Sequence, residues 1–297
     1  MGATAPVVAE GGVVVVGTSD GRLLAFSASG SLLWSAPTGG PVAAAPVVLA
    51  GGDVAYATTA GKLGRVRVAD GVAGPSAAGA PGPTALLPLA DGTLAYTALD
   101  GKMHVAASAD LAELEAVDVD STVPLTLGVG GAILAAGRDG ALRKVVRGRA
   151  PEVWFRASSA LTSSAALSPL GVVLVASAAG RLHAVSADGA ERWSAALEGT
   201  AVGAPAVAPD GSVYVATSEG KVRGFDRDGK EGFAFEPLGV AQPPIVAGGG
   251  TVLFGAEDTK LYAVQPSGRI LFAASLRSRA TSPAALGANG AVYLATE

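Results

Sequence analysis

Basic side chains recur at one equivalent position of a repeated pattern in this sequence, directly after a turn that ends in glycine or, once, in threonine. Of seven such positions, six are Lys or Arg and the seventh is Ala141. Cations in a series can attract carboxylate or phosphate groups, so the pattern predicts a surface for an anion or an acidic partner. Alternatively, each base pairs with an acid of its own turn, and such exposed pairs contribute about 0–1 kcal/mol. The bases are Arg22, Lys62, Lys102, Arg181, Lys221 and Lys260, and the turn acids are Asp20, Asp100, Glu219 and Asp258.

A second group of bases is concentrated in one stretch. Six of the 21 Lys and Arg residues lie within residues 138–156. The stretch before it is acidic, which predicts a bipolar surface that docks a protein partner; alternatively, the charges protect outer strands from edge-to-edge aggregation. Calcium at Asp118 and Asp120 is disfavoured because no glycine-bounded loop gathers more oxygen ligands. The bases are Arg138, Arg143, Lys144, Arg147, Arg149 and Arg156, and the acids are Glu113, Glu115, Asp118 and Asp120.

Residues able to do covalent or metal chemistry are few. Cysteine is absent, which excludes disulfides, thiolate catalysis and cysteine-bound metal. The two histidines, His104 and His183, are expected to be packed or solvated, since a shared metal needs more ligands. The serines within residues 158–164 lack a G-x-S-x-G motif and a nearby base, and no helix follows the glycines of 248–250 to hold phosphate. The sequence therefore predicts no catalytic residue, no metal site and no cofactor.

The elements that carry these residues are set by an internal repeat of about 40 residues. Two glycine series run in step through the chain, the second nine residues after the first. Such regular self-similarity is typical of a repeat architecture. The first series is Gly12, Gly52, Gly92, Gly131, Gly171, Gly211, Gly250 and Gly290, and the second is Gly21, Gly61, Gly101, Gly140, Gly180 and Gly220, with Thr259 in seventh place.

Each repeat is predicted to form four short antiparallel strands. The seven residues between paired glycines, such as VVVVGTS or SVYVATS, are strand-like and too short for a helix. Another strand follows the second glycine, and a proline often opens the first strand, where a missing N–H is tolerated. An aromatic residue on the last strand is expected to pack between repeats. These aromatics are Trp34, Trp154, Trp193, Phe233 and Phe272, whereas Gly74 and Leu114 interrupt the series.

One such sheet is apolar on both faces and must stack on its neighbours, which predicts an all-β protein, a β-propeller of four-stranded antiparallel blades. We expect a single domain, 1–297, with eight blade positions of which the last is half filled; seven blades is the alternative. The half-filled blade has an exposed edge where a second chain could pair, and otherwise we expect a monomer. The predicted repeats are 5–44, 45–84, 85–124, 125–164, 165–203, 204–242, 243–282 and the partial 283–297.

The phrases SDGRLLAFSASGSLLW and AAGRLHAVSADGAERW resemble the PQQ-like, or quinoprotein-type, repeat over nearly the whole chain. The closest resemblance is to BamB-like propellers, which implies eight blades and a non-catalytic scaffold of the bacterial cell envelope or periplasm that binds protein or peptide. In that family, upstream residues would complete the last blade. WD40 repeats match less well because the chain has no Trp-Asp dipeptide. Large quinoprotein dehydrogenases share the blade but carry adjacent cysteines and calcium, so the resemblance does not extend to a bound quinone.

Composition limits the remaining classes. The net charge of −4 gives no general attraction to nucleic acid, and no apolar run approaches the roughly 20 residues that span a membrane. The N-terminal MGATAPVVAE lacks the features of a signal peptide. Two alternatives to a scaffold stay open. One is a quinoprotein-like enzyme that binds a cofactor or a sugar, with clustered carboxylates or arginines at the central channel. The other is a ligand-sensing module of a longer protein, which the abrupt end at Glu297 favours.

Overall fold

The computed structural model describes residues 2–288 and 290–297, and these residues form β-strands joined by turns. They make seven four-stranded sheets and one two-stranded sheet. Within each four-stranded sheet the strands pair in chain order and antiparallel, so each sheet is a meander. Consecutive meanders of this kind are the blades of a β-propeller, which confirms the predicted all-β class. The four-stranded blades of the described chain number seven, as in the seven-blade alternative, and the eighth repeat contributes only the two-stranded sheet.

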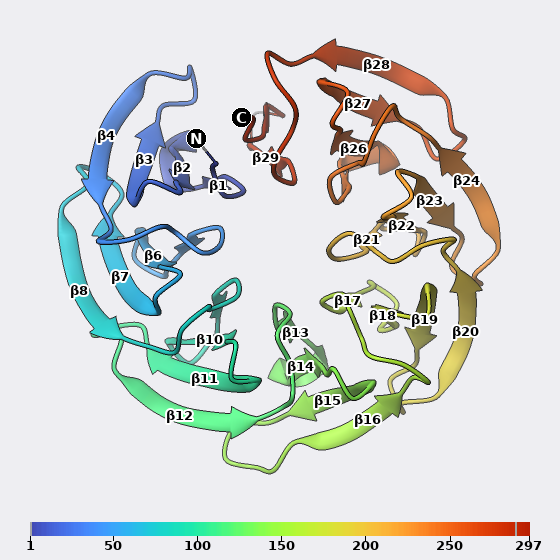
Figure 1. The fold of residues 1–297 in the computed structure, drawn as a ribbon, viewed down its shortest axis with the longest axis horizontal. Coiled ribbons are helices and arrows are strands. Elements are labelled where there is room, and N and C mark those ends of the chain that lie inside the picture. The colour runs from blue at the N-terminus through green and yellow to red at the C-terminus, as the bar shows by residue number, and fades with distance from the viewer. Residues whose placement is uncertain (1, 289) are drawn as a thin grey trace. The chain divides into compact units, whose positions relative to one another are not determined.

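The chain forms two compact units, of which the first contains residues up to Pro124 with Ala285–Ala295 and Glu297. It holds blade 1 (β1–β4), blade 2 (β5–β8), blade 3 (β9–β12) and the half blade (β29–β30), and β29 contacts β1. In Figure 1 the fourth strands of blades 1–3 lie along one margin of this unit. The strands are β1 (Val7–Val8), β2 (Val14–Gly17), β3 (Arg22–Phe26), β4 (Leu32–Pro37), β5 (Val47–Val48), β6 (Asp53–Ala57), β7 (Lys62–Arg67), β8 (Ala73–Ala78), β9 (Leu87–Pro88), β10 (Thr93–Thr97), β11 (Lys102–Ala107), β12 (Glu113–Asp118), β29 (Ala285–Leu286) and β30 (Val292–Tyr293).

The second unit contains Leu125–Ala284 and Thr296. It holds blades 4 to 7, each again with its fourth strand on one margin of the unit (Figure 1). The strands are β13 (Thr126–Leu127), β14 (Ile133–Ala136), β15 (Ala141–Val145), β16 (Glu152–Arg156), β17 (Ala166–Leu167), β18 (Val173–Ser177), β19 (Arg181–Val185), β20 (Glu191–Ala196), β21 (Ala206–Val207), β22 (Val213–Ala216), β23 (Val222–Phe225), β24 (Glu231–Phe235), β25 (Ile245–Val246), β26 (Val252–Gly255), β27 (Lys260–Val264) and β28 (Ile270–Ser275). Three 3-10 turns, Glu10–Gly12, Val129–Gly131 and Gly248–Gly250, each join a first strand to a second.

The two glycine series form the turns, as their spacing predicts. Every member of both series has a positive φ, the backbone region that glycine enters without a Cβ clash. Thr259 takes the place of glycine in blade 7 and has a φ of 62°. The third turn of most repeats also has a glycine with positive φ, for example 86° at Gly30 and 85° at Gly229, whereas in blade 3 Leu111 takes this place with a φ of 65°. The turns are therefore specified by backbone geometry and tolerate different neighbours.

The core lies between consecutive blades of the same unit. One apolar cluster joins Val15 and Leu23 of blade 1 to Val54 and Tyr56 of blade 2, and equivalent clusters join blades 2 and 3, 5 and 6, and 6 and 7. Burial of apolar area at about 25 cal/mol per Å² stabilises this stacking. The repeat therefore buries both faces of a blade only when a neighbour is present, as predicted.

Four of the five strand-four aromatics, Trp34, Trp154, Trp193 and Phe233, pack against the third turn of the next blade as predicted. Phe272 of blade 7 does not follow the prediction, because 47% of its surface is exposed. A Cβ added to Gly71 would lie 2.8 Å from Trp34, and one added to Gly229 would lie 2.5 Å from Trp193. The indole Nε1–H of Trp34 donates to the carbonyl of Val68 at 2.7 Å. Strands β8 and β12 form without an aromatic because pairing with the third strand suffices.

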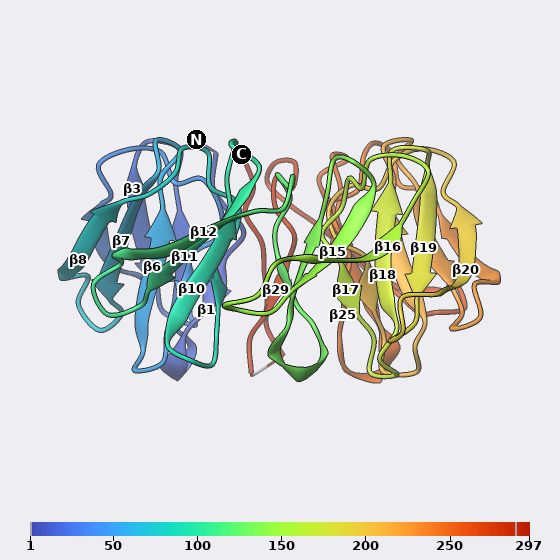
Figure 2. The same ribbon diagram turned by 90° about the horizontal axis from the view of Figure 1, so that it is seen from below.

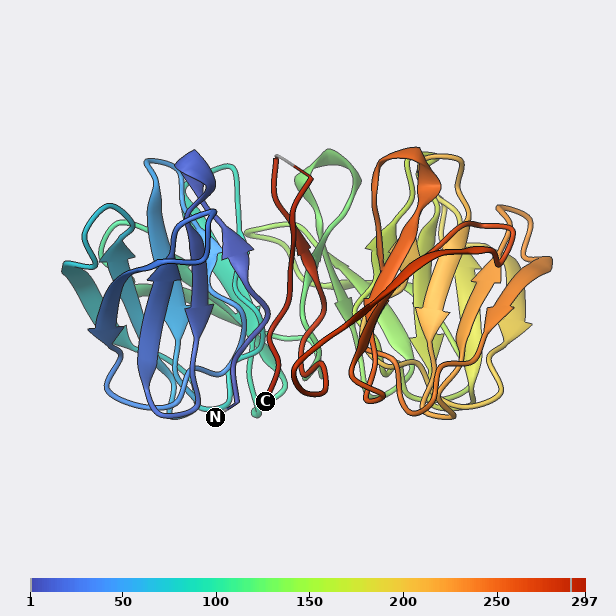
Figure 3. The same ribbon diagram turned by 90° about the horizontal axis from the view of Figure 1, so that it is seen from above.

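Each four-stranded blade has two ends where the chain turns, and these appear at the top and bottom of Figures 2 and 3. Because the strands alternate in direction, the turns between strands two and three share one end with the connections to the next blade. We call this the basic-turn end. The turns between strands one and two, and between three and four, lie at the opposite end. A register shift between strands three and four occurs in all seven four-stranded blades of the described chain, and such bulges increase the twist of the outer strand.

Candidate interaction sites

The predicted basic series occupies the basic-turn end of its blades, at the start of strand three. Three members bind neutral oxygen atoms. Arg22 Nε donates to Ser35 Oγ at 2.7 Å, and Arg181 Nη2 donates to the equivalent serine, Ser194, at 2.6 Å. Lys62 Nζ donates to the carbonyl of Thr38 in the preceding blade at 3.1 Å. These three cations stabilise the ends of their blades, and none of them forms an ion pair with a carboxylate of the described residues.

The other three members differ in their surroundings. Lys221 Nζ lies 3.3 Å from Glu198 Oε2, a carboxylate of the preceding blade. The ammonium groups of Lys102 and Lys260 form no ion pair within the described parts of the chain. Their backbone N–H groups instead donate to the carboxylates of Asp100 and Asp258. Pairing of these lysine side chains with their own turn acids is therefore absent there.

Two of the turn acids, Asp100 and Asp258, instead contact a buried side chain in the middle of strand three. His104 lies 3.1 Å from Asp100 and 3.2 Å from Glu113, and only 5% of its surface is exposed. In blade 7, Tyr262 donates to Asp258, and burial together with this bond raises the pKa of Tyr262 to about 12. The sequence carries a signal for these pairs, a carboxylate four residues before the buried group, which was not recognised in the sequence analysis.

Blades 4, 5 and 6 have other polar groups at the same position. Arg143 donates to both oxygens of Asp139, at 2.9 and 2.8 Å, and this bond lowers the pKa of Asp139 to about 2. His183 Nδ1 lies 2.6 Å from Glu191. Arg223 binds both oxygens of Glu231. The histidines are packed, as predicted, and each contacts a carboxylate on strand four.

Arg223 forms the centre of a charged hollow at the basic-turn end of blade 6. The hollow measures about 200 Å³ and is lined by Lys221, Glu198, Glu231, Phe235 and Glu236, among others. Arg223 Nη1 lies 3.4 Å from Glu198, in addition to its contact with Glu231. Lys221 and Arg223 therefore pair with Glu198 and Glu231 in one ion network, and Glu236 gives the lining one more carboxylate than cations.

The six bases of residues 138–156 do not gather on one surface. Arg138 and Arg156 lie at the basic-turn end of blade 4, where Arg156 Nη1 is 3.4 Å from Asp139. Arg147 and Arg149 lie at the opposite end, in the turn between β15 and β16. Arg143 and Lys144 lie between them on β15 and are half-buried. Any docking at blade 4 therefore uses one end of the blade or the other.

The residues of the acidic stretch lie on strand four of blade 3 and in the connection after it. Glu113 and Glu115 lie on β12, Asp118 ends it, and Asp120 follows in the connection with a φ of 49°. The described residues contain no group of three or more His, Asp or Glu side chains positioned to hold a metal ion. No helix among them is long and apolar enough to cross a membrane.

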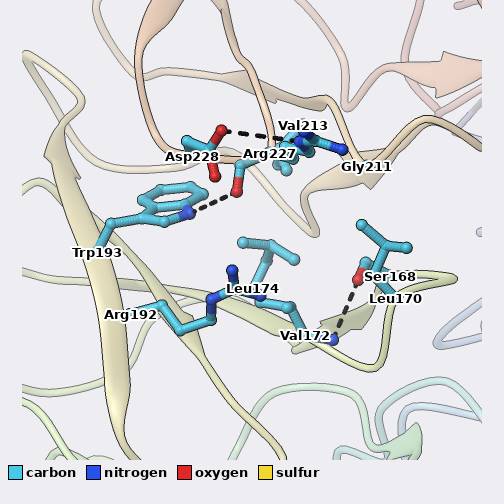
Figure 4. A pocket seen from close by; sticks show the side chains of 10 residues that line it. All are labelled: Ser168, Leu170, Val172, Leu174, Arg192, Trp193, Gly211, Val213, Arg227 and Asp228. Atoms are coloured by element: carbon cyan, nitrogen blue, oxygen red, sulfur yellow. Dashed lines mark hydrogen bonds and ion pairs between the residues drawn. The ribbon is translucent and has the colours of Figure 1, made fainter.

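A different hollow lies between blades 5 and 6, at the end opposite the basic turns (Figure 4). It measures about 220 Å³. Buried Val172, Leu174 and Val213 form its floor, and the indole of Trp193 forms one wall. Trp193 Nε1–H donates to the carbonyl of Arg227 at 2.9 Å, which ties the wall to the turn above it. The remaining lining residues are Ser168, Leu170, Arg192, Gly211, Arg227 and Asp228.

The same place between blades 4 and 5 has a smaller hollow. It measures about 40 Å³, and Trp154 and Leu134 take the places of Trp193 and Leu174 one repeat earlier. The residue that corresponds to Arg227 is Ala187. The larger hollow is therefore a departure from the repeat, and its residues were absent from the sequence-based site prediction.

The chain is similar to a known protein family and to solved structures. The family model described as outer membrane protein assembly factor BamB matches residues 2–126 and 138–293. Among solved structures, the computationally designed Ika8 protein is similar, with a TM-score of 0.80 and 18% identity over 99% of this chain and 96% of that chain. BamB from Moraxella catarrhalis is similar too, with a TM-score of 0.79 and 15% identity over 98% of this chain and 90% of that one. No curated protein sequence matches the chain.

Proposed function

Because the chain belongs to the family of the outer membrane protein assembly factor BamB, we propose that it is a non-catalytic scaffold for outer membrane protein assembly in a bacterial cell envelope. The observation that carries the proposal is the family match, which includes all seven four-stranded blades in whole or in part. The partners on this proposal are proteins or peptides, and the place of action is the periplasm or the envelope.

The blade ends supply the binding surface in this proposal. Repeat proteins present side chains at regular spacing along an extended surface, which suits contact with a long partner. Cations at blade ends steer an acidic partner and raise its association rate. Lys102 and Arg149 are the best placed of the predicted basic residues, because both are exposed and neither side chain forms an ion pair or a hydrogen bond within the described residues.

Deletion of the gene that encodes this chain, in the bacterium it comes from, tests this function. We expect the amount of folded outer membrane β-barrel proteins to fall and to recover when the wild-type gene is restored. Heat-modifiability on gels, which separates folded from unfolded barrels, measures this amount. Unchanged barrel levels in the deletion strain would contradict the assembly role, and a quinone cofactor bound to the purified chain would contradict the non-catalytic role.

A further inference from the structure

We propose that the hollow between blades 5 and 6 binds one large apolar side chain of an extended peptide whose adjacent residue is acidic. The proposal rests on the proposed function, since it names the peptide chemistry that one part of the scaffold recognises. It follows from the size of the hollow, the charges on its rim, its departure from the repeat and the rigidity of its wall.

The size and floor of the hollow suit a single side chain. Its volume is about 220 Å³, below the range of about 300–1,000 Å³ in which proteins bind whole small molecules. The floor residues Val172, Leu174 and Val213 are apolar and at most 8% exposed. An apolar side chain placed on this floor leaves water and contacts the apolar side chains of these three residues.

The rim of the hollow favours an anion beside that side chain. Arg192 is exposed and has neither an ion pair nor a side-chain hydrogen bond within residues 2–288 and 290–297. Arg227 and Asp228 are also exposed, and Arg227 Nε lies 3.7 Å from the Asp228 carboxylate. Two guanidinium groups against one carboxylate give the rim a net positive charge. A carboxylate next to the inserted side chain complements this charge.

The repeat supplies an internal control for this reasoning. Between blades 4 and 5, Val153 and Ala187 occupy the places of Arg192 and Arg227, and the hollow shrinks to about 40 Å³. Blade packing there proceeds without either arginine. Blade stacking therefore requires neither the arginines nor the extra volume, and both are present between blades 5 and 6.

The wall of the hollow is held in place before any ligand arrives. The Trp193 indole is fixed by its bond to the Arg227 carbonyl and by close packing on Gly229. Phe225 lies against the same indole with a centroid distance of 6.4 Å. A preorganised wall lowers the entropy lost when a peptide binds, which makes a site of this small area effective.

Fluorescence polarisation with labelled synthetic peptides tests the proposal on the full chain. The probe is a fluorescein-labelled hexapeptide of sequence GSFEGS, with GSAEGS and GSFQGS as comparison peptides. We expect the loss of the aromatic ring to weaken binding by about tenfold or more, because alanine places much less apolar area on the floor of the hollow. Replacement of the acid by its amide should weaken binding about two- to fivefold, as for an exposed ion pair.

Charge reversal locates the binding site. Arg192→Glu should weaken GSFEGS binding by about fivefold or more, because a repulsive carboxylate replaces an attractive cation. Arg269→Glu makes the same charge change in an exposed turn of blade 7 and should leave binding within about twofold of wild type. Arg192 is exposed, so the variant should fold, and circular dichroism confirms this.

Three results would overturn the proposal: equal affinity for all three peptides, no measurable binding of GSFEGS, or unaltered binding by folded Arg192→Glu. These results are separable from failure of the scaffold function. If gene deletion lowers outer membrane barrel levels and the peptides do not bind, only the assignment of this hollow is wrong.

Discussion

At the scale of single residues, Thr259 holds a backbone conformation that glycine holds in the other six repeats. Its φ is 62°, in the left-handed region that costs an L-residue about 1–2 kcal/mol. Thr259→Gly removes this strain, and the greater freedom of glycine in the unfolded chain offsets about 0.5–1 kcal/mol of the gain. We expect the variant to be more stable by up to about 1 kcal/mol, measured by denaturant unfolding.

A second threonine-to-glycine substitution, at a position without backbone strain, shows whether the gain in stability comes from the relief of strain. Thr251 has a φ of −65°, which threonine adopts without strain. Thr251→Gly should therefore lower the free energy of unfolding, because only the entropy cost applies there. A Thr259→Gly protein less stable than wild type would show that the turn is not strained.

The residue scale also shows where sequence reasoning stops. The two histidines were expected to be packed or solvated, and in the structure both are buried and contact carboxylates. Their partners were not predicted, because one of the two interpretations of the basic series paired the turn acids with the bases directly after the turn. In the structure Asp100 and Asp258 bind the residues four positions later, His104 and Tyr262, which are buried and need compensation for lost water.

At the scale of elements, contact between an aromatic residue and the next blade's turn joins consecutive blades. Gly229 and Gly30 have nearly equal φ values, 85° and 86°. A Cβ on Gly229 would lie 2.5 Å from Trp193, whereas one on Gly30 would meet nothing within 4 Å. Gly30→Ala should cost about 1–2 kcal/mol for the backbone alone. Gly229→Ala should cost about 1–3 kcal/mol more, since overpacking is added.

Thermal or denaturant unfolding of the two glycine variants checks this difference. The Gly30→Ala protein serves as the control for the backbone term. Equal stability of the two variants would mean that the contact of Trp193 with the next blade contributes nothing to blade stacking.

The sequence predicted most elements because backbone geometry dictates them. Positive φ at the two glycine series sets the turns, and the first strands follow their prolines, as in β5 after Pro46. The register shift between strands three and four was not predicted. It arises because the outer strand twists to pack on its neighbour, and this tertiary effect leaves no fixed residue type in the sequence.

At the scale of the whole molecule, the repeat indicates the fold more clearly than it indicates the binding site. A pattern shared by all copies identifies the scaffold, and the family match supports the predicted resemblance. A binding site, however, is indicated by residues that differ between one repeat and the others. Arg192 and Arg227 stand where the preceding repeat has Val153 and Ala187. A search for residues common to all repeats does not find such differences. The basic series was easier to see because it is periodic, yet three of its members bind neutral oxygens.

Chemical crosslinking in the intact envelope, followed by affinity isolation of the chain and quantitative mass spectrometry, tests the scaffold claim most directly. The control is an unrelated envelope protein carrying the same tag and expressed to the same level. We predict that outer membrane β-barrel proteins or the machinery that assembles them are enriched with this chain by at least about tenfold over the control, as expected for a specific interface that contributes about 1.4 kcal/mol or more beyond nonspecific contact. Recovery of these proteins at the control level would contradict the account.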